Sequence, residues 1–184
     1  MDGDLDLIET KISSENIYDG TLLHVKKDKV ELPNGDISYR EWIKHPGASA
    51  VIPVTDNNEI ILVRQYRYPI QSLTMEIPAG KLDVAGEDPL ECAKRELEEE
   101  TGYSAQEYQF LTKLATTVGF SDEFIYIYAA RGLKAGQQHT DEDEFINVYK
   151  YSFDELKKMV IDGTLDDGKT IALMYKIELM GLDK

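Results

Sequence analysis

A cluster of carboxylates near the middle of the chain is the feature best suited to chemistry. The run RELEEETGY, residues 95–103, holds Glu96, Glu99 and Glu100. Residues three and four apart share one face of a helix, so these three side chains should point the same way. Like charges on one face repel and destabilise an isolated helix. A hard divalent cation with oxygen ligands, Mg²⁺ above all, would neutralise them, so the spacing predicts a metal site.

Local signals predict that this cluster lies on an amphipathic helix. Asp88 can cap its N-terminus, Pro89 suits the first helical position, and Gly102 is a typical C-terminal stop. The apolar residues at helical spacing, which should form its buried stripe, are Leu90, Ala93 and Leu97. The simpler interpretation is a solvated acidic face paired with Lys94 and Arg95. Charge composition alone favours that simpler interpretation.

The residues around the helix resemble the signature of the Nudix hydrolases. That signature is a glycine, five residues, a glutamate, seven residues, and then Arg-Glu-apolar-x-Glu-Glu-x-Gly-apolar. The matching residues are Gly80, Glu87, Arg95, Glu96, Leu97, Glu99, Glu100, Gly102 and Tyr103. The chain departs once, because six residues rather than five separate Gly80 from Glu87. The spacing within the helix, which carries the expected metal ligands, is unchanged.

Length and composition agree with a small enzyme. The 184 residues suit one domain, with room for a small extension. The net charge of −15 argues against a nucleic-acid partner or an anionic membrane surface. The single Cys92 cannot form a disulfide within the chain, and the acidic N-terminus does not read as a signal peptide. We therefore expect a cytoplasmic protein.

The pattern along the chain predicts an α/β fold. Strands are expected near residues 5–12, 19–31, 37–44, 48–54, 60–67, 110–117, 124–131 and 144–152. Besides the motif helix, helices are expected from Ser152 to Gly163 and from Lys169 to Met180. The resemblance implies the Nudix fold, a mixed β-sheet sandwiched between helices. It also implies a small N-terminal β domain over 1–45 and a catalytic domain over 46–184.

Further segments resemble the ADP-ribose pyrophosphatase branch of that family. They are 18–20, 32–35, 39–41, 63–69 and 76–80. That branch implies a homodimer whose N-terminal domains are exchanged and whose partner chain helps hold the nucleotide. The branch usually has a proline 16 residues beyond the signature glycine, where this chain has Val118. We therefore expect a broader substrate class, nucleoside diphosphate sugars including ADP-ribose, cleaved into a nucleoside monophosphate and a sugar phosphate.

The expected metal site uses the motif helix and the strand before it. Glu96 and Glu100, one turn apart, are the first-choice ligands, and Glu99 is either a third ligand or a supporting carboxylate. The resemblance implies that the main-chain carbonyl of Ala79 is also a ligand, and Arg95 is expected to orient the acidic side chains. Mg²⁺ would neutralise the diphosphate and make water a better nucleophile, and Mn²⁺ could replace it.

The general base should come from outside the helix, because the helix carboxylates are occupied by metal. The acidic segment 140–144 is the place where the family branch carries an acidic loop. We favour Glu142 as the base and Glu144 as an additional metal ligand, and the reverse assignment stays open. An acidic surface loop is the simpler interpretation, and His139 is an alternative base.

Substrate contacts should involve the few basic residues near the motif. Arg64 and Arg67 lie on the strand that leads to it, and a guanidinium fork suits phosphate and ribose oxygens. Arg40 and Glu76 are also expected to contact substrate. The alternative role of the arginines is to pair with the surplus of acids. Two other functions stay open: another Nudix substrate, such as a dinucleoside polyphosphate or GDP-mannose, and a non-catalytic nucleotide-sugar sensor.

Overall fold

The computed structural model describes residues 4–181, and these form two compact units. One unit runs through Gly47 and includes the segment Ala115–Phe124. The other comprises Ala48–Leu114 and the chain from Ile125 onward. The carboxylate helix belongs to the second unit, which we call the catalytic unit; the first is the N-terminal unit.

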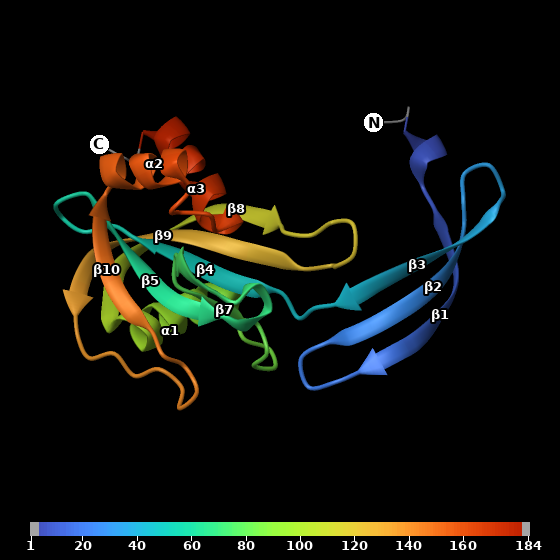
Figure 1. Ribbon diagram of the computed structural model, residues 1–184, viewed down its shortest axis with the longest axis horizontal. Helices are drawn as coiled ribbons and strands as arrows, with labels where there is room; N and C mark the ends of the chain where they lie inside the picture. The colour runs from blue at the N-terminus through green and yellow to red at the C-terminus, as the bar shows by residue number, and fades with distance from the viewer. Residues whose placement is uncertain (1–3, 182–184) are drawn as a thin grey trace. The chain divides into compact units, whose positions relative to one another are not determined.

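The N-terminal unit is built on a three-stranded antiparallel sheet in the order β1-β2-β3 (Figure 1). The strands are β1 (Thr10–Asp19), β2 (His24–Glu31) and β3 (Ile37–Lys44), preceded by the 3₁₀ turn η1 (Leu5–Leu7). The strand expected over 5–12 therefore starts later, after η1. The strand expected over 19–31 is interrupted, because the Gly20 N–H donates to the Leu23 carbonyl (2.9 Å) and closes a turn.

The segment Ala115–Phe124 is held against the end of β3. The Ile43 N–H donates to the Phe120 carbonyl (2.8 Å), and the Asp122 N–H donates to the Ile43 carbonyl (3.3 Å). The Asp122 carboxylate in turn accepts from the His45 N–H (2.7 Å). These main-chain contacts explain why a segment distant in sequence joins the N-terminal unit.

The catalytic unit contains two sheets. The four-stranded sheet has the order β7-β4-β9-β8, in which β4 (Ala48–Pro53) runs parallel to β9 (Phe124–Ala135) and antiparallel to β7 (Ala79–Lys81). Its last strand is β8 (Tyr103–Ala115). The three-stranded sheet is antiparallel, with β5 (Glu59–Arg67) between β10 (Asn147–Ser152) and β6 (Ser72–Glu76). The short turn η2 (Tyr68–Ile70) joins β5 to β6.

Helices cover both sides of these strands. In Figure 1, α2 (Phe153–Asp162) and α3 (Gly168–Met180) lie on one side and α1 (Pro89–Thr101) on the other. Every residue of β4 is buried, and successive residues face opposite layers. Ile52 packs in the main core, which includes Leu173 of α3, whereas Val51 packs against Leu97 of α1. The predicted α/β architecture, a mixed sheet between helices, is confirmed.

The sequence pattern missed or shortened several strands. It did not predict β6 and β7, because the stretch around Pro78 and Gly80 reads as a linker. It found only the later part of β8, which starts directly after the helix, and placed the start of β10 too early. None of the helices in the part of the chain the structure describes is long and apolar enough to cross a membrane.

Candidate active site

Helix α1 presents two of the three clustered glutamates to the protein interior. Its start is capped by the Asp88 carboxylate, which accepts from the Leu90 N–H (2.8 Å), and Gly102 ends it with φ of 74°. Glu96 is only 8% exposed and Glu100 only 3%. The helix therefore does not have a fully solvated acidic face, which was the simpler expectation.

Strand β7 lies directly against these two carboxylates. A Cβ atom placed on Gly80 would sit 1.8 Å from Oε1 of Glu96, so only glycine allows this approach. One residue earlier, the Ala79 N–H donates to Oε2 of Glu100 (3.1 Å). The carboxylate pair is thus enclosed between α1 and the main chain of β7.

The Arg95 guanidinium forms hydrogen bonds with three carboxylates of the motif. Its Nε and Nη2 donate to Oε1 and Oε2 of Glu87 at 3.0 and 3.2 Å. Its Nη1 donates to Glu96 (2.7 Å) and to Glu99 (2.9 Å). The hydrogen bonds to Glu87 and the neighbouring carboxylates raise the pKa of Arg95, and the same pairing lowers the pKa of Glu87. Arg95 therefore contacts Glu96 and Glu99, two of the acidic side chains that we expected it to orient, and also Glu87.

Burial makes the carboxylate pair hard to ionise. Desolvation, opposed by Arg95, raises the pKa of Glu96 to about 7. Desolvation and the charge of Glu96 raise the pKa of Glu100 to about 8, although the Ala79 N–H opposes the shift. Two ionised carboxylates here would need a cation to offset both burial and mutual repulsion.

The donor chemistry of this site fits a hard divalent cation. Among residues 4–181, no three His, Cys, Asp or Glu side chains converge closely enough to hold a metal by themselves. Glu99 is turned toward Arg95, which leaves Glu96 and Glu100 beside the main chain of β7. All of these groups offer oxygen donors, which suit Mg²⁺ or Mn²⁺ rather than softer metals.

We expect the metal-free protein to lose stability as pH rises from about 5 to 8. The folded-state pKa values of about 7 and 8 exceed the ordinary 4.5, so the folded state binds more protons across this range. Stability is therefore highest where both carboxyls are protonated, and Tm should fall by at least roughly 5 °C between these limits. Melting in EDTA at each pH measures this, and Mg²⁺ should raise Tm more at pH 8 than at pH 6. A flat profile would contradict it.

The segment after β9 is fastened to the C-terminal end of α1. The Gly136 N–H donates to the Gly102 carbonyl (2.6 Å), and the His139 N–H donates to the Glu99 carbonyl (3.1 Å). The Gln138 side-chain amide donates to the Glu100 carbonyl (2.7 Å). These contacts satisfy main-chain carbonyls that a helix end leaves unpaired. Gln138 was not predicted, and nothing in the local sequence indicates its role.

This attachment brings the acidic loop toward the carboxylate pair. Burial and the Asp141 charge raise the pKa of Glu144, and the Glu144 charge in turn raises the pKa values of Glu96 and Glu100. By accessible surface, both Glu142 and Glu144 are exposed on this loop. The ring of His139 contacts the Gln137 carbonyl (2.9 Å). Glu144 therefore lies close enough for its charge to act on the two helix carboxylates.

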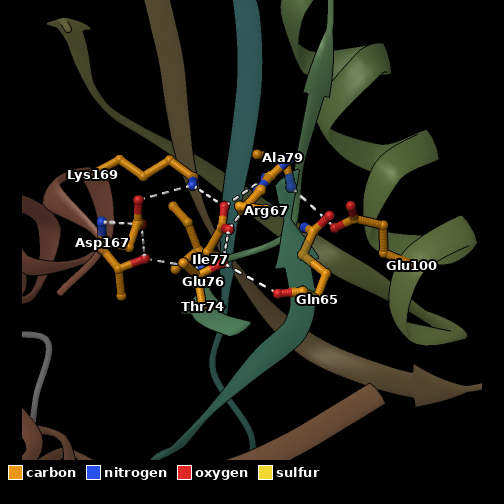
Figure 2. Close-up of polar contacts among 10 residues, drawn as sticks. Gln65, Arg67, Thr74, Glu76, Ile77, Ala79, Glu100, Asp167 and Lys169 are labelled. Carbon is orange, nitrogen blue, oxygen red and sulfur yellow. Dashed lines mark hydrogen bonds and ion pairs between the residues drawn. The ribbon is translucent and has the colours of Figure 1, made fainter. Parts of the chain in front are cut away.

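Of the predicted substrate-binding residues in the catalytic unit, Arg67 and Glu76 lie together, whereas Arg64 lies apart from them. Nε and Nη2 of Arg67 bind the two carboxylate oxygens of Glu76, both at 2.7 Å, and Lys169 also binds this carboxylate (Figure 2). Burial alone would raise the pKa of Glu76, but the two cations lower it to about 2. Arg64 is exposed and, three residues before Arg67, lies on the opposite face of β5. Arg40 lies in the N-terminal unit, where it contacts Glu9, Ser38 and Tyr39.

Comparisons with known proteins agree with this geometry. Residues 44–174 match the NUDIX domain, and residues 9–43 match the nucleoside diphosphate sugar hydrolase N-terminal domain. The chain is 41% identical over 175 residues to an ADP-ribose pyrophosphatase of Bacillus subtilis, covering 94% of each protein. It is 43% identical over 173 residues to a methanol dehydrogenase activator of Bacillus methanolicus, covering 93% of each.

More distant relatives extend the same pattern. A GDP-mannose pyrophosphatase of Yersinia enterocolitica is 35% identical over 148 residues, covering 75% of this chain and 76% of the relative. The crystal structure of an ADP compounds hydrolase superimposes with a TM-score of 0.82 over 94% of this chain and 93% of that one, and its 23% identity speaks to the fold alone. With its matched domain and its carboxylate helix against β7, this chain belongs to the Nudix hydrolase family.

Proposed function

We propose that this enzyme hydrolyses the diphosphate bond of nucleoside diphosphate sugars, ADP-ribose among them, with Mg²⁺ as cofactor. The observation that carries the proposal is the buried pair Glu96 and Glu100 against the main chain of β7. Relatives named ADP-ribose pyrophosphatase and GDP-mannose pyrophosphatase support the substrate class. The products would be a nucleoside monophosphate and a sugar phosphate.

The chain's own residues would divide the work as follows. Glu96 and Glu100 would hold the cation, together with the Ala79 carbonyl, and Arg95 fixes Glu96 and Glu99 in place. Mg²⁺, when bound, would neutralise the diphosphate and lower the pKa of the attacking water. Glu142 or Glu144 would accept a proton from water as the general base, and Glu144, whose charge acts on the helix carboxylates, would be the additional ligand.

We also propose a cytoplasmic homodimer that uses the N-terminal unit. Every residue of β1 is exposed, including the apolar Ile12 and Ile17, and β1 is an edge strand with unpaired main-chain groups. A second copy of the chain would cover this surface. Arg40 of this unit and Arg64 of the catalytic unit stay predicted substrate contacts, whereas Arg67 and Glu76 pair with each other. Sedimentation velocity tests the dimer, and a monomer at micromolar concentration would contradict it.

A substrate panel tests the reaction. We would incubate the protein with Mg²⁺ and ADP-ribose, ADP-glucose, GDP-mannose, UDP-glucose or a dinucleoside polyphosphate, and separate the products by chromatography. Release of a nucleoside monophosphate from several diphosphate sugars, lost in EDTA, is the expected result. Tight binding without turnover would instead support a nucleotide-sugar sensor. Turnover of the dinucleoside polyphosphate alone would show that dinucleoside polyphosphates, and not nucleoside diphosphate sugars, are the substrates.

A further inference from the structure

The link between β6 and β7 is anchored at three consecutive residues. The Ile77 N–H donates to Oγ1 of Thr170 in α3 (3.0 Å). The Pro78 carbonyl accepts from the Val51 N–H in β4 (3.0 Å). The Ala79 N–H donates to Glu100 in α1 (3.1 Å). One short segment therefore connects α3, β4 and the carboxylate helix, and its path sets where the main chain of Ala79 lies.

Thr170 is oriented for this contact by the cap of its own helix. The Asp167 carboxylate caps α3 and accepts from both the N–H (3.0 Å) and the hydroxyl (2.5 Å) of Thr170. The hydroxyl hydrogen is thus committed to Asp167, which leaves the oxygen lone pairs to accept from the Ile77 N–H. Thr170 is 1% exposed, so water cannot readily take the place of its hydroxyl as the acceptor for the Ile77 N–H.

The same turn of α3 also holds the side chain next to Ile77. Lys169 binds the Glu76 carboxylate and, at 3.1 Å, that of Asp167, while Arg67 binds Glu76 from the other side (Figure 2). The charges of two cations and two carboxylates balance within this group, and each charged side chain has an oppositely charged partner. Since it needs no anionic ligand to be satisfied, we interpret the group as a clamp on the 76–79 segment.

We propose that Thr170 is a positioning residue, which acts through Ile77 and Ala79 to hold the main chain of β7 where Glu100 and a metal ion can use it. This inference rests on the metal site of the proposed function. Thr170→Val keeps the shape but removes the acceptor, which leaves the Ile77 N–H buried and unpaired. Removing a group that orients a metal site in this way typically lowers the metal affinity by about 10-fold or more.

The test measures Mn²⁺ binding without substrate, from the electron paramagnetic resonance signal of the free ion. Thr170→Val should weaken binding by about 10-fold, whereas Thr170→Ser, which keeps both hydrogen bonds, should bind like wild type. The matched control is Ser152→Ala, which removes the analogous cap of α2, where Ser152 accepts from the Glu155 N–H (3.3 Å). Hydrogen exchange of residues 76–81 should be faster only in Thr170→Val.

Each outcome separates the inference from the proposed function. A folded Thr170→Val that binds Mn²⁺ as tightly as wild type would overturn the inference and leave the metal site intact. If that variant does not fold, Thr170→Ala, which removes the same acceptor for the Ile77 N–H with a smaller side chain, is the second variant, with the same expected direction. Unchanged binding there would equally overturn it. If the wild-type protein binds no Mn²⁺, both the proposed metal site and this inference are wrong.

Discussion

Glu100→Gln should lower kcat by roughly 10³-fold, about 4 kcal/mol of transition-state stabilisation, while raising the Tm of the metal-free protein. Glutamine keeps the shape of Glu100 and an oxygen that can accept from the Ala79 N–H. It removes a negative charge from a side chain that is nearly fully buried. The activity falls because the metal loses a charged ligand. The stability of the metal-free protein rises because no carboxylate at this position must be desolvated on folding.

The two readouts must move in opposite directions at the same position. Hydrolysis of ADP-ribose at saturating Mg²⁺ gives kcat, and melting in EDTA at pH 8 gives Tm. Glu98→Gln is the matched control, because it makes the same charge change on an exposed residue of α1 and should alter neither quantity much. Near-wild-type turnover by Glu100→Gln would show that this carboxylate is not a metal ligand.

The sequence predicted the helix well because its signals are local. The Asp88 cap and the terminal Gly102 act as expected, and Ala93 and Leu97 of the predicted stripe are buried, whereas Leu90 is only half-buried. What the pattern could not show was that Glu96 and Glu100 are buried. Their burial comes from β7, a three-residue strand containing Gly80 that has too little side-chain pattern to be recognised.

The contacts that cross between elements were the least predictable. Arg67 pairs with Glu76 because β5 and β6 form a hairpin, and that pairing was not foreseen because β6 was not. Thr170 lies 93 positions from its partner Ile77, and Gln138 lies 38 from Glu100. No periodicity or motif relates residues at such distances, so only the folded chain identifies them.

Gly80→Ala should remove at least about 100-fold of kcat/KM, and most of the Mn²⁺ affinity, while leaving the fold nearly as stable as wild type. The added Cβ would lie 1.8 Å from Oε1 and 2.0 Å from Cδ of Glu96. Those atoms form the end of a flexible side chain, so the carboxylate moves rather than the backbone. Tm should change by less than about 4 °C, whereas the displaced Glu96 carboxylate can no longer bind the metal.

The matched control is Gly168→Ala, because a Cβ there meets no atom within 4 Å and the change should leave turnover intact. A sharper test combines Gly80→Ala with Glu96→Gln. Both changes act by removing one carboxylate from the metal, so their effects on kcat/KM should be strongly non-additive, and the double variant should be little worse than either single one. Fully additive losses would mean that Gly80 contributes through something other than Glu96, and the close approach of β7 to α1 would need another explanation.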